Sequence, residues 1–144
     1  MIVTAALVAF TVYALWRRPD WVAGGLLLSL IVSTVMGWTQ PAARLPGMLG
    51  GMDALVSIGM LIVWTRYRSQ RARIVGTVSL LKCAWAFLMS ANSIDWLFYA
   101  IALNAAFVFQ VLVAGGMADG LVAWLDTIDP RTVRERRRRV DQLG

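Results

Sequence analysis

The sequence predicts an all-α integral membrane protein in which five helices cross the bilayer as an up-and-down bundle. Of the 144 residues, 59% are hydrophobic and only 15% are charged, and apolar runs recur along the whole chain. Soluble domains carry roughly a quarter charged residues, so this composition is typical of membrane proteins. The five runs cover residues 2–16, 21–38, 51–65, 74–91 and 94–114. Since roughly 20 residues cross a bilayer, we expect the short first and third runs either to borrow flanking residues or to include a re-entrant segment.

Arginine is concentrated in alternate connections between these runs. Nearly all of the 14 basic residues follow the first, third and fifth runs, whereas Arg44 lies on the opposite side and Lys82 lies inside the fourth run. Because cytoplasmic connections concentrate arginine and lysine, the pattern predicts an N-terminus outside and a C-terminus inside. A four-span arrangement would place arginine-rich connections on both sides. The basic residues of the inner side are Arg17, Arg18, Arg66, Arg68, Arg71, Arg73, Arg131, Arg134, Arg136, Arg137, Arg138 and Arg139.

Aromatic residues mark the ends of the same runs, where amphipathic rings favour the headgroup level. They are Trp16, Trp21, Trp38, Trp64, Tyr67 and Trp96. The chain therefore divides into a five-span bundle over residues 1–116 and a cytoplasmic tail over residues 117–144. Short connections predict antiparallel neighbours. We expect the longest connection, residues 39–50 with its prolines and glycines, to be irregular and to lie at the outer surface.

Small residues repeat every fourth position along the second run, at Gly25, Ser29, Ser33 and Gly37. Small side chains let helix backbones approach closely in lipid, where apolar burial gives no gain. The stripe predicts a tight helix–helix seam. This seam could lie within the monomer, which we favour, or between subunits.

Polar residues inside the membrane are costly and therefore informative. Lys82 is central in its run, and Asn104 lies at a similar depth in the next, so we expect Asn104 to be its contact. Asp53, near the outer end of the third run, is the carboxylate best placed to approach Lys82, whereas Gln110 should reach interface water. These residues could form a polar site or pore-lining layer, or a structural lock; alternatively, the lysine snorkels. If these residues form only a structural lock, we expect the substitution Lys82→Met to preserve folding.

The C-terminal segment combines a short amphipathic stretch with a basic tail. We expect Asp119 to cap a short helix that carries Leu121, Trp124, Leu125 and Ile128 on one face and lies in the inner interface. The arginines that follow should attract anionic lipid. They lack a recognised nucleic-acid motif, so nucleic acid is not an expected partner. The predicted lipid-binding residues are Arg131, Arg134, Arg136, Arg137, Arg138 and Arg139.

Residues typical of catalysis are scarce. The chain has no histidine, one cysteine (Cys83) and one glutamate (Glu135). Membrane enzymes usually need a nucleophile with a base, or several metal ligands. We therefore predict a protein that is not an enzyme and that holds no cofactor or metal.

Several short motifs together resemble small multi-spanning membrane proteins encoded by tailed phages and prophages. They are Trp16-Arg17-Arg18-Pro19, Gly50-Gly51-Met52-Asp53, Asp95-Trp96, Ala102-Leu103-Asn104-Ala105-Ala106 and Gly115-Gly116. Some proteins of that group are holin-like. The resemblance implies a multi-pass protein of the bacterial inner (cytoplasmic) membrane that self-associates, and it carries over no catalytic residue.

Three functional interpretations follow from these features. The first is a holin-like, self-associating protein that permeabilises the inner membrane, which fits the small size, the small-residue stripe, the basic tail and the phage resemblance. The second is a non-catalytic subunit or anchor of a larger membrane assembly, which fits the lack of catalytic residues. The third is a small channel or transporter that uses Lys82.

Overall fold

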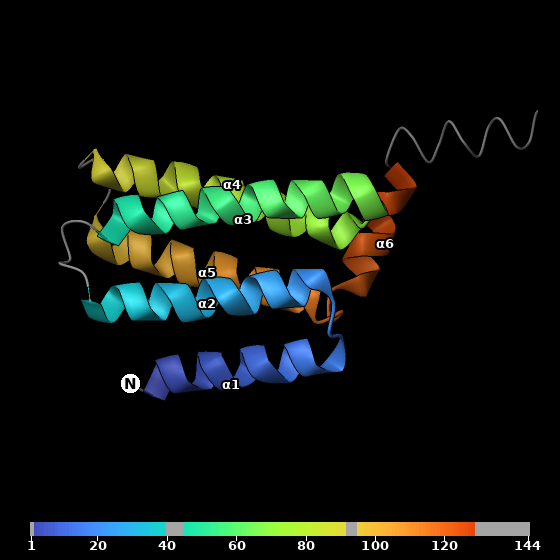
Figure 1. Cartoon of the computed structure of the whole chain (residues 1–144), viewed down its shortest axis with the longest axis horizontal. Helices are drawn as coiled ribbons and strands as arrows, with labels where there is room; N and C mark the ends of the chain where they lie inside the picture. Colours follow the sequence, from blue (N-terminus) through green and yellow to red (C-terminus); the bar gives the residue numbers. More distant parts are fainter. Residues whose placement is uncertain (1, 40–44, 92–94, 129–144) are drawn as a thin grey trace, which may run out of the picture.

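The computed structural model describes residues 2–39, 45–91 and 95–128. Within these ranges the chain is all-helical and contains no strand, as the sequence predicts (Figure 1). The helices are α1 (Ile2–Arg17), α2 (Trp21–Thr39), α3 (Leu45–Tyr67), α4 (Gln70–Ser90), α5 (Trp96–Ala114) and α6 (Asp119–Ile128).

Four of these helices, α2 to α5, are long and apolar enough to cross a membrane. The protein is therefore a multi-pass membrane protein by length and composition. Helix α1 has 16 residues. At 1.5 Å per residue it rises about 24 Å, which is less than the roughly 30 Å of a typical hydrocarbon core.

The third helix begins six residues earlier than the apolar run that predicts it. It starts at Leu45 rather than at residue 51, and Pro46 falls in its first turn, where the missing N–H has no helical partner to lose. The expectation of an irregular connection up to residue 50 is therefore wrong for residues 45–50. With 23 residues, α3 is fully long enough to span, because it does borrow its flanking residues.

Side-chain caps explain where several helices begin. Asp20 Oδ1 accepts a hydrogen bond from Ala23 N (2.8 Å) ahead of α2, and Ser69 Oγ accepts one from Ala72 N (3.3 Å) ahead of α4. Asp95 Oδ1 accepts from Leu97 N (2.7 Å) ahead of α5. Each carboxylate or hydroxyl satisfies a backbone N–H that has no partner inside the helix.

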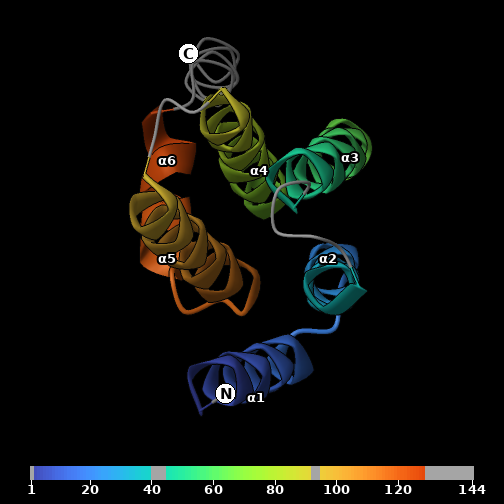
Figure 2. The ribbon, with the colours of Figure 1, turned by 90° about the vertical axis from the view of Figure 1, so that its left-hand side faces the viewer.

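Helices α1 to α5 lie side by side, and α6 lies across one end of the bundle (Figures 1 and 2). Sequential helices are antiparallel, so the α1–α2 and α3–α4 connections share the end that α6 covers (Figure 1). The arginines of those two connections are thereby gathered at a single end. Helix α3 packs most extensively on α4, whereas α1 makes smaller contacts with α2 and α5.

The bundle is apolar outside and partly polar inside, which is the reverse of a soluble helical bundle. Large apolar side chains such as Leu55, Leu81, Phe87 and Phe98 are exposed on its surface. The buried polar and charged side chains are Thr11, Ser29, Asp53, Ser57, Ser79, Lys82 and Gln110. Apolar side chains can face lipid without loss, whereas polar groups in the hydrocarbon region need partners within the protein.

Candidate functional site

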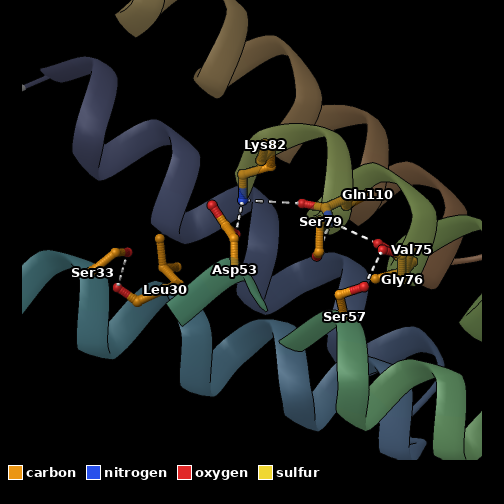
Figure 3. Close-up of polar contacts among 9 residues, drawn as sticks. All are labelled: Leu30, Ser33, Asp53, Ser57, Val75, Gly76, Ser79, Lys82 and Gln110. Atoms are coloured by element: carbon orange, nitrogen blue, oxygen red, sulfur yellow. Dashed lines mark hydrogen bonds and ion pairs between the residues drawn. The ribbon is translucent and has the colours of Figure 1, made fainter. Parts of the chain in front are cut away.

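A buried ion pair joins α3 to α4 in the middle of the bundle. Lys82 Nζ donates to Asp53 Oδ1 at 2.7 Å, and both side chains are almost fully buried (Figure 3). The Lys82 ammonium also lies 5.6 Å from the centre of the Phe107 ring on α5, within the range of a cation–π contact. The lysine therefore does not snorkel: its charge is neutralised inside the protein.

Gln110 on α5 extends this pair into a network of three helices. Its Oε1 accepts from Lys82 Nζ (3.4 Å), and its Nε2 donates to Ser79 Oγ (2.7 Å) and to Val75 O (3.0 Å) (Figure 3). Gln110 is 0% exposed, so the expectation that it reaches interface water is wrong. The reason is its direction, because it faces α4 rather than the end of the bundle.

Asn104 is not the partner of Lys82. It is exposed, and its Nδ2 donates to Ala100 O one turn earlier in α5 (2.9 Å). Six residues separate Asn104 from Gln110, and at 3.6 residues per turn their side chains point about 120° apart. Helix rotation, and not equal depth along the helices, therefore decided the partner: it placed Gln110, and not Asn104, against α4.

A small cavity borders the ion pair where all four long helices meet. Its volume is about 90 Å³, and its polar lining comes from Ser29 and Ser33 of α2, Asp53, Lys82 and Asn104. It is large enough to hold water and offers that water several polar partners. The three predicted polar-site residues thus border one cavity, although Asn104 does not contact Lys82.

The predicted stripe on α2 is only partly used within the monomer. Gly25 and Ser29 face α3, and a Cβ at Gly25 would lie only 2.6 Å from Met60 Cε. Ser33 borders the small cavity and donates to Leu30 O at 3.0 Å (Figure 3). A Cβ at Gly37 would meet nothing within 4 Å, so the stripe is open at the Thr39 end of α2.

The most extensive helix contact lies elsewhere, between α3 and α4. A Cβ at Gly50 would be 3.0 Å from Ala86 Cβ, and one at Gly76 would be 3.0 Å from Met60 Cβ. Across this contact Ser57 Oγ donates to Gly76 O at 2.9 Å (Figure 3). A signal for it was present in the sequence, because small residues alternate at spacings of four and three along α4. They are Ala72, Gly76, Ser79, Cys83 and Ala86.

The basic end of the bundle holds a second polar arrangement. Asp119, the first residue of α6, pairs with Arg18 (3.1 Å) and with Arg71 (2.7 Å). The expectation that Asp119 caps α6 is therefore wrong: its carboxylate is used between helices. Helix α6 is amphipathic as predicted, and Trp124 and Ile128 are exposed. The six predicted lipid-binding arginines, at positions 131–139, lie outside the described residues.

No protein-family model matches the chain, and no curated protein or solved structure is significantly similar to it. Its function must therefore be argued from its own residues.

Proposed function

We propose that this protein is a holin-like membrane protein that self-associates and permeabilises the inner membrane of a bacterium. The observation that carries the proposal is a set of exposed glycines on α3, each with open space where a side chain would lie. A Cβ at Gly47, Gly51 or Gly59 would meet no atom within 4 Å. With Leu55, these residues repeat every fourth position and form one exposed stripe.

Three residues of this stripe, Gly51, Leu55 and Gly59, line an open groove between α2 and α3. The groove has a volume of about 620 Å³, and its lining is almost entirely apolar. Four of the seven methionines border it: Met36, Met48, Met52 and Met60. Methionine is flexible and adapts to different neighbours, and glycine permits close backbone approach, so both favour a second helix in this groove. The proposed occupant is the same face of another copy of this chain.

The polar interior supports association between copies rather than passage through one copy. Asp53, Lys82 and Gln110 satisfy one another. The cavity beside them has a volume of only about 90 Å³, which suits water rather than a larger solute. A path for larger solutes therefore has to form between copies. The phage resemblance of the sequence agrees with such a role.

The topology that we propose has five spans, with the N-terminus outside and the C-terminus inside. It is supported by the antiparallel packing of α1 beside α2 and by the arginine-rich connections at a single end of the bundle. A reporter active only in the cytoplasm should work when fused after Gly144 and fail when inserted at residues 41–46. Activity at residues 41–46 would contradict this topology.

At the inner side, the tail arginines at 131–139 are proposed to bind anionic lipid.

Dye release from liposomes tests the function. The protein should release an encapsulated dye with a steep dependence on the protein-to-lipid ratio, because several copies must meet. Gly51→Leu should reduce release strongly while the monomer still folds, since the monomer has space at this position. Ala105→Leu is the matched control: it also enlarges an exposed small residue, but on α5. Absence of release by the unaltered protein would contradict permeabilisation and favour a non-catalytic subunit or anchor.

A second candidate, a small channel or transporter, is favoured by the cavity that all four long helices border. Intramembrane ionisable residues commonly mark ion or proton pathways. This candidate predicts ion flux at low protein density that survives Gly51→Leu and is lost when Asp53 and Lys82 are both replaced by apolar residues. The holin-like proposal predicts the opposite response to each change.

A further inference from the structure

One carboxylate on α6 bridges two arginines that belong to different helices. Asp119 Oδ2 lies 3.1 Å from Arg18 Nη2, and Asp119 Oδ1 lies 2.7 Å from Arg71 Nη2. Arg18 follows α1, and Arg71 lies in the first turn of α4. The Asp119 side chain is 43% exposed, and that of Arg18 is 47% exposed. The two guanidinium groups therefore converge on one anion that water and lipid headgroups can reach.

The backbone beside this bridge is shaped around the Arg18 guanidinium. Gly116 has a φ of +76°, a conformation that residues with a Cβ rarely adopt. A Cβ at this position would lie 3.1 Å from Arg18 Nε and 3.2 Å from Arg18 Cζ. The turn between α5 and α6 thus leaves room for the Arg18 side chain to reach Asp119. The backbone at Gly116 therefore accommodates the position of Arg18 beside Asp119.

We propose that Arg18 and Arg71 form a binding site for the phosphate of an anionic lipid headgroup, and that Asp119 is an internal ligand which this phosphate displaces. Paired arginines suit phosphate because their planar N–H forks match its oxygens. Arginines outnumber the acids at this end within the described residues, where the acids are Asp20, Asp119 and Asp126. The site also lies at the end that we place at the inner leaflet, where lipid phosphates are concentrated.

Displacement of Asp119 would change what α6 can do. Its contacts with the bundle are few, and the exposed side chains of Trp124 and Ile128 already lie on its apolar face. The pair with Arg18 is exposed and the pair with Arg71 is partly buried. Ion pairs that water reaches contribute little stability, so a phosphate that binds both arginines can replace Asp119. Once released from Arg18 and Arg71, α6 can lie in the membrane interface with its apolar face buried. Anionic lipid would thereby move α6 from the bundle to the bilayer.

A fluorophore on α6 can report this movement. We would attach an environment-sensitive label through Thr127→Cys in a Cys83→Ser background, since Thr127 is exposed near the end of α6. The labelled protein would be placed in phosphatidylcholine vesicles, in the same vesicles with increasing phosphatidylglycerol, and in phosphatidylcholine vesicles with inorganic phosphate. We expect the label to enter a more apolar environment as phosphatidylglycerol rises, and inorganic phosphate to have a weaker effect because it is not concentrated at the surface.

Matched variants separate the site from general charge attraction. Asp119→Asn should lower the phosphatidylglycerol fraction needed for half of the response by about fivefold, the size expected for loss of one exposed and one partly buried ion pair. Asp126→Asn makes the same charge change on the same helix and should not. Combined Arg18→Gln and Arg71→Gln should abolish the response, whereas Arg66→Gln should retain it.

Two results would overturn the proposal. Equal shifts from Asp119→Asn and Asp126→Asn would show general electrostatics, and a response to inorganic phosphate without one to phosphatidylglycerol would contradict a lipid ligand. The inference rests on the proposed position of this end at the inner leaflet, which the reporter fusions test separately. It does not depend on membrane permeabilisation, which dye release tests.

Discussion

The two faces of α3 carry glycines at neighbouring positions, yet their surroundings differ. Towards α4, a Cβ at Gly50 would press on Ala86, and Asp53 and Ser57 on the same face bond with α4. Towards α2 and lipid, a Cβ at Gly51 would meet nothing within 4 Å. A glycine gains nothing by facing the acyl chains of lipid. The face of α3 with Gly50, which we call the filled face, packs on α4, whereas a side chain on the face with Gly51, the open face, would enter open space within the described part of the chain. This contrast is the basis of the proposed self-association.

The largest expected effect comes from breaking the ion pair on the filled face. Lys82→Met leaves Asp53 and Gln110 buried without their shared donor, so it should destabilise the bundle by about 3 kcal/mol or more. The measurement is the folded fraction during titration of mixed micelles with denaturing detergent. This expectation replaces the one drawn from the sequence, that Lys82→Met preserves folding. A stability within about 0.5 kcal/mol of the unaltered protein would show that the pair contributes nothing.

A smaller effect is expected from enlarging the glycine on the filled face. Gly50→Leu forces side-chain atoms towards Ala86 and the α4 backbone, and such overpacking costs typically about 1–3 kcal/mol. The same detergent titration would measure it. If α3 and α4 were not tightly packed at this position, Gly50→Leu would be neutral.

The smallest effect on stability is expected one residue further along. Gly51→Leu places its side chain in open space, so the monomer should be unchanged or more stable by about 1 kcal/mol, because leucine favours helix more than glycine does. The adjacent pair of variants makes the comparison sharp, since both add the same side chain to the same helix. Equal losses from Gly50→Leu and Gly51→Leu would remove the distinction between the two faces.

Hydropathy was sufficient to predict the helices, because a span needs only length and apolar composition. The boundaries of α2 and α5 therefore fall within two residues of the predicted runs. The start of α3 could not be found in this way, since Pro46, Gly47 and Gly50 suggest an irregular segment. Counted from Leu45, Asp53 is the ninth residue of its helix and lies about 12 Å along it. It is thus deep enough to reach Lys82, which the later predicted start concealed.

Helix rotation limited the prediction of the polar site. Lys82 and Asp53 were identified as candidate residues because intramembrane charges need partners. The choice between Asn104 and Gln110 depended on which face of α5 turns to α4, and both residues are compatible with the apolar run. The bonds from Gln110 to Ser79 and to Val75 O are tertiary contacts that periodicity cannot reveal. The ion pairs of Asp119 with Arg18 and Arg71 were also missed. An aspartate at the start of a helix is equally compatible with a helix cap and with an ion pair to another helix, and the sequence does not show which one forms.

The central claim is that the membrane-embedded charges are neutralised by each other inside one copy of the chain. The most direct test is a double-mutant cycle on Asp53 and Lys82, read by the same detergent titration. Asp53→Leu and Lys82→Met should each destabilise the bundle strongly, and the double replacement should recover most of the loss, because no buried charge remains unpaired. A double variant whose loss equals the sum of the two single losses would contradict the claim.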